Sequence, residues 1–373
     1  MPTASSAATD RAHMLRALRL AERGRGRTAP NPVVGAVLVK AGRVIAEGWH
    51  AHLGAAHAEA MALAKAGSSA RGATLYVTLE PCAHQGRTPP CTGAILAAGV
   101  RRCVVALRDP HAIVNGRGLR VLRAAGVAVE VGLCAAEARQ TLAAYVRAHT
   151  HGLPRVTWKV AATLDGRIAD AQGHSRWITG PAARRIGHHL RAVSDAIVIG
   201  AGTARADDPK LTARLGAGKA VTQPLRVVCD SHLALPLTLA LYSCALAAGT
   251  VVACGAKAAP KRIAALEARG VRVWRLPLAG GRVSMSALAK RLVREGCHEV
   301  LIEGGASLGS SWLRAKLVQR LALFTAPRVL GAGRFWAQDL GVGLATAPSG
   351  LVRSIARIGE DTLTWVAFAP EEA

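Results

Sequence analysis

The sequence predicts an α/β protein of two domains. Short apolar segments alternate with segments of helical periodicity along the 373 residues, which is typical of sheets covered by helices. Apolar residues make up 51% of the chain, enough for two cores of ordinary domain size. The segment 149–154 interrupts the alternation before a new strand begins at Arg155. We therefore expect one domain over residues 1–150 and a second over residues 151–373.

The first domain is expected to alternate strands with helices. The predicted strands span residues 33–39, 44–46, 74–79, 103–107 and 127–131. The first predicted helix begins at Asp10, because Met14, Leu15 and Leu18 follow one helical face, and further helices span 58–65, 92–98 and 119–125. Residues 1–10 are small and polar, so we expect a loose tail there.

The second domain is expected to be built in the same way. Its predicted strands span residues 155–161, 195–200, 225–229, 250–254, 271–275, 299–303, 320–324 and 362–368, with helices between several of them. Open α/β sheets bind ligands where strands pass into helices. We therefore expect functional residues at these corners in both domains.

Composition restricts the classes of function. The formal charge is +25, but the arginines are dispersed among alanine, glycine and leucine, and aromatic residues make up only 3%. This pattern is typical of a basic surface that attracts phosphorylated ligands, and less typical of a nucleic-acid site. No apolar run is long enough to span a membrane. The eight cysteines are spread along the chain, and the six other than Cys82 and Cys91 lie in contexts typical of reduced core thiols, so we expect a cytoplasmic protein.

Three potential metal ligands and one further acid lie close together in the first domain. His57-Ala58-Glu59 is followed by Cys82 and, after eight intervening residues, by Cys91. A catalytic zinc site takes three protein ligands and leaves one position for water, whose pKa the metal lowers. We predict His57, Cys82 and Cys91 as ligands and Glu59 as the catalytic proton shuttle. A His-x-Glu motif followed by Pro-Cys is typical of zinc-dependent deaminases.

The spacing of the cysteines distinguishes among these enzymes. Nucleic-acid and cytidine deaminases have two residues between them, whereas this chain has eight. The longer form, with Gly-Arg-Thr-Pro-Pro before Cys91, resembles the deaminase half of the bifunctional RibD family of riboflavin biosynthesis. Similar motifs occur at 31–37, 48–50, 78–81 and 109–110. The resemblance implies a cytidine-deaminase-like α/β/α domain.

The second half resembles the reductase half of the same family. The motifs that carry this resemblance lie at 159–167, 175–180, 206–212 and 303–306. They imply a dihydrofolate-reductase-like α/β domain that uses NADPH. Independently of the resemblance, Gly304-Gly305 between a strand and a helix allows backbone N–H groups to approach a phosphate. Taken alone, such a glycine pair is more typical of a turn.

The resemblance also implies ligand-binding residues in this half. The predicted substrate contacts are Ser175, Arg191, Leu211, Arg214 and Glu303. The predicted cofactor contacts are Ala161, Trp177, Thr203, Asp207, Gly305, Ala306, Ser307, Leu308, Gly309, Ser310 and Ser311. Arg191 and Arg214 suit a phosphate, because a guanidinium can form bidentate hydrogen bonds. No pattern identifies a site for the 2′-phosphate, so the choice of NADPH over NADH rests on the resemblance.

Four sites differ from the RibD pattern. Thr163 replaces a serine, His111-Ala112 replaces Asn-Pro, Gln319-Arg320 replaces an acidic pair, and Gln85 replaces another residue. None is a predicted metal ligand or proton shuttle. We expect these differences to affect substrate contacts or a subunit interface rather than the two reactions.

Several histidines lack a ligand role in this interpretation. His50 and His84 match family positions beside the zinc motif and are expected near the substrate, whereas His52 is expected to be structural. His149 and His151 lie in the predicted connector without further ligands. We expect that pair to be exposed to solvent, since a structural zinc site needs four ligands.

Together these observations predict a bifunctional enzyme. The first domain would deaminate 2,5-diamino-6-(5-phosphoribosylamino)pyrimidin-4-one with Zn²⁺, and the second would reduce the ribosyl group of the product with NADPH. The expected partners are this phosphorylated pyrimidine and further copies of the chain in a homo-oligomer, without a membrane or nucleic acid. The alternative is an RNA- or tRNA-editing zinc deaminase with an RNA-docking second domain, which a salt-dependent RNA gel shift would distinguish.

Overall fold

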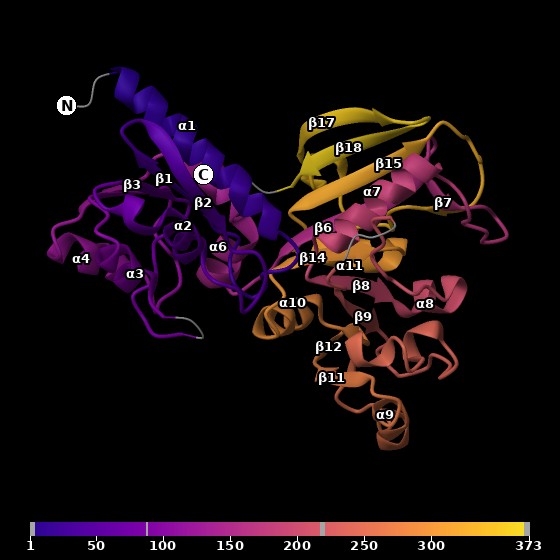
Figure 1. Ribbon diagram of the computed structural model, residues 1–373. Coiled ribbons are helices and arrows are strands. Elements are labelled where there is room, and N and C mark those ends of the chain that lie inside the picture. Colours follow the sequence, from indigo (N-terminus) through magenta and orange to yellow (C-terminus); the bar gives the residue numbers. More distant parts are fainter. Residues whose placement is uncertain (1–3, 87–88, 217–220, 369–373) are drawn as a thin grey trace. The chain divides into compact units, whose positions relative to one another are not determined.

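The protein divides into two compact units in the computed structural model, which describes residues 4–86, 89–216 and 221–368 (Figure 1). The first unit ends at Gly152 and the second begins at Leu153, whereas the sequence pattern placed the boundary after residue 150. Arg87 and Thr88 of the zinc motif lie outside the described residues. No helix of the described residues is long and apolar enough to cross a membrane.

The first unit is built on one mixed sheet. Its strands are β1 (Gly35–Lys40), β2 (Arg43–Trp49), β3 (Thr74–Val77), β4 (Arg102–Val105) and β5 (Ala128–Val131), in the order β2-β1-β3-β4-β5. β1 is antiparallel to β2 and β3, while β3, β4 and β5 are parallel. Its helices are α1 (Ala4–Ala21), α2 (Ala58–Ala66), α3 (Cys91–Ala97), α4 (Arg117–Ala124), α5 (Ala135–Thr141) and α6 (Ala143–His151).

Helices cover both faces of this sheet, as the sequence predicts. On one face, Leu38 and Leu75 pack with side chains of α2, α3 and α4. On the other face, Val37 and Tyr76 pack with side chains of α1 and α5. Successive residues of a strand point to opposite faces, so β1 and β3 each contribute to both cores.

Two expectations for this unit are wrong. Helix α1 begins at Ala4 rather than at Asp10, because the alanines at its start favour a helix over a loose tail. The connector expected around His149 is the last turn of α6. His149 is only partly exposed there, because its ring packs 4.4 Å from the ring of Tyr145 and 4.5 Å from that of His111. His151 is exposed, as expected.

The second unit is built on a larger sheet with the strand order β11-β10-β9-β8-β14-β6-β15-β18-β17. These strands are β6 (Arg155–Thr163), β8 (Ala196–Gly200), β9 (Leu225–Cys229), β10 (Thr250–Gly255), β11 (Arg272–Leu276), β14 (Glu299–Glu303), β15 (Arg320–Ala326), β17 (Leu351–Ile358) and β18 (Asp361–Ala367). Two small ribbons pair β12 (Leu278–Ala279) with β13 (Arg282–Val283), and β7 (Arg167–Ala169) with β16 (Arg334–Phe335). The helices are α7 (Pro181–Ala192), α8 (Ala201–Asp207), α9 (Pro260–Glu267), α10 (Met285–Arg294) and α11 (Ala306–Arg314).

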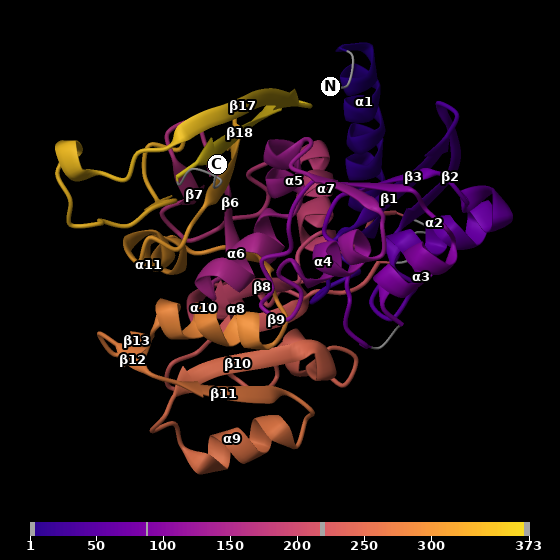
Figure 2. The same cartoon turned by 90° about the vertical axis from the view of Figure 1, so that its left-hand side faces the viewer.

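Helices also cover both faces of the larger sheet. Val198 packs in a core that includes side chains of α10 and α11, whereas Ile199 packs with side chains of α8 and α9. Figure 2 shows β10 and β11 lying between α9 and α10. From β11 to β15 in this order, each strand is parallel to the next, so their carboxyl ends meet at one edge of the sheet.

All eight strands predicted for this unit are confirmed, but β17 was missed. Leu351, Val352 and Ile355 of β17 are exposed, and Arg353 and Ser354 lie between the last two of them. The strand therefore lacks the regular alternation of buried and exposed residues by which strands are recognised. It is held instead by its antiparallel pairing with β18.

Candidate active sites

The three predicted metal ligands converge in the first unit. His57 precedes α2, Cys91 is the first residue of α3, and Cys82 lies in the segment after β3. His57 Nδ1 lies 3.2 Å from Cys91 Sγ and 3.6 Å from Cys82 Sγ. In a tetrahedral zinc site, zinc–ligand distances of about 2.0–2.3 Å place the ligand atoms about 3.5–3.8 Å apart. The His57–Cys82 distance matches this spacing, the His57–Cys91 distance is slightly shorter, and all three ligand atoms lie within 4.8 Å of one another, close enough to share one metal ion.

The protonation of the two thiols also fits a divalent cation. A hydrogen bond from Cys91 lowers the pKa of Cys82 to about 4, with a further contribution from His57, although burial opposes this shift. The same hydrogen bond and burial raise the pKa of Cys91, because a second thiolate beside the first is unfavourable. A metal ion would stabilise both thiolates at once. Two sulfurs and one imidazole are ligands for zinc rather than for magnesium or calcium.

Glu59 lies beside this cluster as the second residue of α2. Its side chain is buried, and burial raises its pKa to about 7. Helix α2 can approach β2 closely because Gly48 has no side chain; a Cβ there would lie 2.1 Å from the carbonyl oxygen of Ala58. A carboxyl group with a pKa near neutrality can both accept and release a proton, as a general acid–base catalyst must.

The histidines around the cluster differ in their surroundings. His50 is buried, and its Nε2 lies 3.2 Å from Asn31 Nδ2, while its Nδ1 lies 3.2 Å from the carbonyl oxygen of Ala56. Its ring meets that of His57 edge-on, with centroids 5.4 Å apart. Protein groups thus engage both nitrogens of His50. His84 is exposed, and His52 is an exposed residue whose Nδ1 lies 3.1 Å from the Leu53 carbonyl oxygen.

Glu80, which lies in the motif at 78–81, holds nearby backbone in place, a role that the sequence did not reveal. Its buried carboxylate accepts hydrogen bonds from backbone N–H groups at the start of α4 and in the loop before it. The donors are Gly116 at 2.8 Å, Gly118 at 2.9 Å, Asp109 at 3.3 Å and Leu119 at 3.4 Å. Glu80 thereby fixes the segment that leads into Pro81 and Cys82. The sequence feature that could have identified Glu80 is an acidic residue directly after a buried strand.

The second unit contains a cleft of about 2370 Å³ at the carboxyl ends of β6, β8, β9 and β14. All five predicted substrate residues line it, namely Ser175, Arg191, Leu211, Arg214 and Glu303. The predicted cofactor residues on its wall are Ala161, Trp177, Thr203, Asp207, Gly305, Ala306, Ser307, Leu308 and Ser311. Gly309 and Ser310 do not line the cleft. Both are buried, and Ser310 Oγ accepts a hydrogen bond from the Gln338 N–H at 2.9 Å.

Glu303 and Arg191 form a bidentate ion pair in the cleft, with distances of 2.6 and 2.7 Å. Burial opposes ionisation of Glu303, but the charge and hydrogen bonds of Arg191, together with the charge of Lys159, hold its pKa below the ordinary value. Arg191 also donates to the Thr212 carbonyl oxygen at 3.1 Å. The guanidinium fork of Arg191 is thus directed at protein groups. Arg214 is exposed and forms no carboxylate ion pair among the described residues, so it suits a phosphate better.

Lys159 is the cleft residue that sequence reasoning missed. It lies on β6 and lines the cleft, and in the sequence it is only the first residue of the motif at 159–167. Burial lowers the pKa of Lys159; the charge of Glu303 opposes this shift, while that of Arg191 adds to it. An amine in this position can give or take a proton near the reacting centre.

The loop Gly304-Gly305 leads from β14 into α11. Both glycines have positive φ angles, +85° and +55°, and a Cβ on Gly304 would lie 2.7 Å from Thr203 Cγ2. Only glycine allows this backbone conformation beside α8. The loop places the first N–H groups of α11 at the cleft, where a phosphate can bind them.

Comparisons with known proteins match each of the two units to a protein family. Residues 7–107 match the cytidine and deoxycytidylate deaminase zinc-binding region, and residues 154–362 match the RibD C-terminal domain. The riboflavin biosynthesis protein RibD of Escherichia coli is 39% identical over 365 residues, which cover 94% of this chain and 97% of that protein. RibD of Aquifex aeolicus is 40% identical over 324 residues, or 87% and 88% of the two chains.

The chain belongs to the RibD family. Solved structures agree. RibD of Acinetobacter baumannii is 36% identical and matches with a TM-score of 0.89 over 97% of this chain and 99% of that one. A diaminohydroxyphosphoribosylaminopyrimidine deaminase/5-amino-6-(5-phosphoribosylamino)uracil reductase from Thermotoga maritima is 32% identical, with a TM-score of 0.84 and the same coverage. The RNA-editing alternative is not favoured, because the second unit is a RibD reductase domain.

Two departures from the RibD pattern keep the chemistry of the residue they replace. Thr163 Oγ1 donates to Asp165 at 2.6 Å and accepts from the Arg167 N–H at 2.9 Å, which a serine hydroxyl could also do. His111 Nδ1 accepts a hydrogen bond from the N–H of Ile113 at 3.1 Å. An asparagine side chain forms the same bond to the residue two positions ahead. Gln85 is exposed, and nothing in the structure explains its identity.

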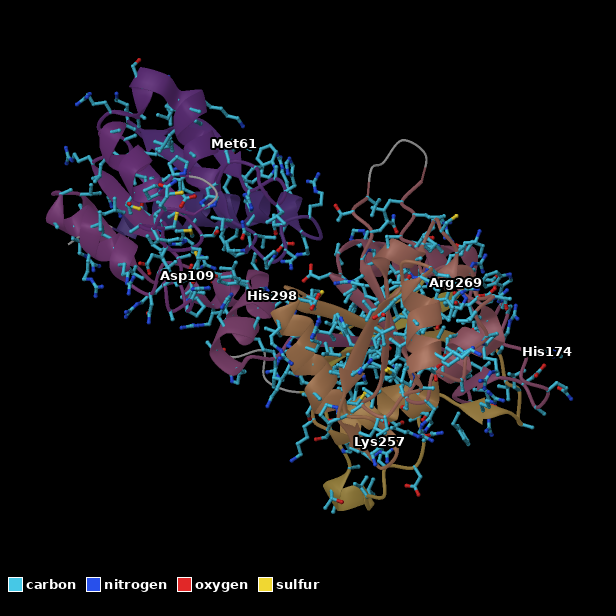
Figure 3. All side chains as sticks on the ribbon, turned by 90° about the horizontal axis from the view of Figure 1, so that it is seen from below. Met61, Asp109, His174, Lys257, Arg269 and His298 are labelled. Carbon is cyan, nitrogen blue, oxygen red and sulfur yellow. The ribbon has the colours of Figure 1, made fainter. Side chains whose placement is uncertain are left out.

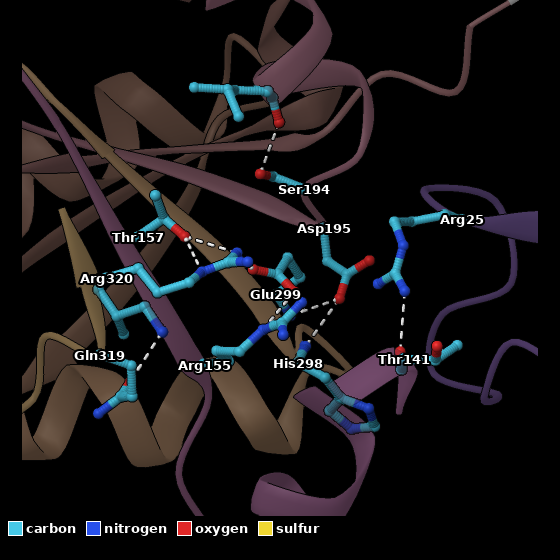
Figure 4. A network of polar contacts seen from close by, with 12 residues as sticks. Arg25, Thr141, Arg155, Thr157, Ser194, Asp195, His298, Glu299, Gln319 and Arg320 are labelled. Atoms are coloured by element: carbon cyan, nitrogen blue, oxygen red, sulfur yellow. Dashed lines mark hydrogen bonds and ion pairs between the residues drawn. The ribbon is translucent and has the colours of Figure 1, made fainter. Parts of the chain in front are cut away.

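The Gln319-Arg320 departure lies at the amino ends of β6, β14 and β15 (Figure 4). Gln319 Oε1 accepts from the Val156 N–H at 2.9 Å, and Arg320 donates to Glu299 at 2.8 Å. Arg155 pairs with the same Glu299 at 2.6 Å. The cleft lies at the opposite, carboxyl ends of these strands. The departure therefore lies away from the residues that line the cleft, and it contributes to an ion-pair network that joins three strands.

Basic side chains are distributed broadly in this member of the RibD family. Side chains that end in nitrogen are spread over the periphery of each unit (Figure 3). Within the cleft, lysines and arginines outnumber the acids among the lining residues. A surface of this kind attracts phosphorylated ligands over long distances.

Proposed function

We propose that this chain catalyses two reactions of riboflavin biosynthesis. The first is hydrolytic deamination of 2,5-diamino-6-(5-phosphoribosylamino)pyrimidin-4-one, and the second is NADPH-dependent reduction of the ribosyl group of 5-amino-6-(5-phosphoribosylamino)uracil to a ribityl group. We assign deamination to residues 1–150 and reduction to residues 151–373. The observation that carries the proposal is the convergence of His57, Cys82 and Cys91 in a chain whose second unit holds a separate cofactor cleft.

In the first unit, His57, Cys82 and Cys91 would hold the zinc ion. When bound, the zinc would supply Lewis-acid chemistry that lowers the pKa of the attacking water. Glu59 would accept a proton from that water while the water oxygen attacks the ring carbon that bears the 2-amino group. Glu59 would then deliver the proton to the amino nitrogen as the carbon–nitrogen bond breaks and ammonia leaves. The pKa of about 7 suits both halves of this exchange.

In the second unit, bound NADPH would supply a hydride to C1 of the ribosyl group. The bond from C1 to the ring oxygen breaks, and that oxygen takes a proton. Lys159 is our candidate donor of this proton, since it lies in the cleft with Glu303. Arg191 would orient Glu303, while Ser175, Leu211 and Arg214 would contact the substrate, with Arg214 at its phosphate.

The location and assembly of the enzyme are part of this proposal. All eight cysteines are free thiols, which is typical of a reducing compartment, so we assign the protein to the cytoplasm. We also expect a homo-oligomer, because a second copy could cover the exposed apolar residues of β17.

The direct test is to supply the pyrimidine phosphate with and without NADPH and to measure ammonia and product mass. We expect ammonia in both cases and a product heavier by two hydrogens only with NADPH. Ammonia alone would refute the reductase assignment. Absence of both products from metal-loaded enzyme would refute the proposal as a whole.

A further inference from the structure

One wall of the cofactor cleft is a hairpin to which neither the sequence motifs nor the resemblance gave a role. Strands β12 and β13 are antiparallel and are joined by a turn at Gly280 and Gly281, and the hairpin lines the cleft. Val283, the last residue of the hairpin, is buried, and its N–H donates to Ser231 Oγ at 3.0 Å. Since Ser231 follows β9, this contact fixes the hairpin above the carboxyl ends of the parallel strands.

Arg282 extends from this hairpin to the cofactor loop. Its Nη1 donates to Ser307 Oγ at 2.6 Å, and Ser307 lies in the first turn of α11. Arg282 is exposed and forms no ion pair with any of the residues that the structure describes. A guanidinium has five N–H donors, so most of those on Arg282 remain for a ligand.

The order of the strands gives the direction in which the cofactor lies. The proposed proton donor Lys159 lies on β6, so the nicotinamide of a bound cofactor would lie there, and the Gly304-Gly305 loop that could bind a phosphate follows β14. Beyond β14 the sheet continues with β8 and β9, each about 4.8 Å farther on. A dinucleotide whose nicotinamide lies at β6 and whose diphosphate lies at α11 therefore directs its adenosine towards β9, beneath the hairpin.

The acid at the end of β9 is not free to bind a ribose. In many NAD sites a carboxylate after a strand binds the ribose hydroxyls. Here the buried Asp230 accepts hydrogen bonds from the N–H groups of Ala234 at 3.0 Å and Leu235 at 2.9 Å. The group that the hairpin adds to this part of the cleft wall is the cationic Arg282. We propose that Arg282 binds the 2′-phosphate of NADPH and thereby selects NADPH over NADH.

This inference rests on the proposed reductase function, and direct cofactor binding tests it. The dissociation constants of NADPH and NADH would be measured by fluorescence titration of the full chain without a pyrimidine. For Arg282→Gln we expect the NADPH constant to rise about 10- to 100-fold and the NADH constant to change less than about 3-fold. Arg282→Lys keeps the charge and should lose less. Arg294→Gln, an exposed arginine outside the cleft, is the control for the loss of one charge and should leave both constants unchanged.

The other outcomes have distinct meanings. Equal weakening of both cofactors would overturn the inference, because Arg282 would then bind a group common to NADPH and NADH. Unchanged constants for both cofactors would overturn it as well. If the unsubstituted protein failed to bind NADPH at all, both the reductase assignment and the inference would be refuted. NADPH binding by the unsubstituted protein is therefore measured first.

Discussion

Among the individual residues, Glu59 has surroundings that suit a proton shuttle. It is buried beside the metal-ligand cluster, and its pKa is raised to about 7. Glu59→Gln keeps the size of the side chain but cannot accept a proton. We expect ammonia release to fall by about 10²- to 10⁴-fold, with zinc content and ribosyl reduction unchanged. Ammonia assays, metal analysis and NADPH oxidation with the uracil substrate measure these three quantities.

A matched control for this variant lies in the same unit. Glu130→Gln changes an exposed carboxylate on β5 that pairs with Arg102, and it should leave all three quantities unchanged. Loss of zinc from Glu59→Gln would contradict the assignment, because the residue would then support the metal rather than move a proton.

Residue chemistry could be predicted where the sequence itself carries the pattern. The spacing of His57, Cys82 and Cys91 predicted a cluster, and the structure brings the three side chains together. Lys159 and Glu80 were missed because their surroundings come from strands and loops distant in sequence. A lysine in a strand shows nothing of its neighbour Glu303, and an acid after a strand shows nothing of the N–H groups around it. The ligand roles themselves remain predictions.

At the scale of elements, Glu80 joins β3 to the start of α4. Removing it in Glu80→Ala leaves several buried N–H groups without their acceptor, and we expect a loss of about 3 kcal/mol of stability in the first unit. Thermal unfolding of the metal-loaded protein, followed by circular dichroism, would show one transition at lower temperature. An unchanged transition temperature would show that the loop before α4 keeps its conformation without the Glu80 carboxylate. Glu130→Ala is again the surface control.

Elements were predictable where a buried face repeats regularly. The parallel strands of both units were all found, and the clearest of them, such as β8 and β10, are nearly continuous apolar segments. Helix α1 was expected too late because its first turns show no apolar periodicity, although they contain alanines, which favour a helix. Strand β17 was missed because pairing with β18, rather than burial, makes it a strand.

At the scale of the whole molecule, the chain carries two separate units with one candidate site each. Each unit has its own sheet, its own cores and its own set of reactive side chains. The predicted metal ligands belong to the first unit, and the cofactor cleft is lined by residues of the second. The central claim is therefore that one chain performs two reactions, of which only the first needs zinc.

The measurement that tests this claim most directly is the effect of zinc removal on the two reactions. The chain would be treated with a chelator, and each half-reaction would be assayed with its own substrate. We predict that ammonia release is lost and returns on addition of zinc, while NADPH-dependent reduction of 5-amino-6-(5-phosphoribosylamino)uracil continues at its original rate. Ammonia release that persists in zinc-free protein, or a reduction that stops with it, would contradict the account.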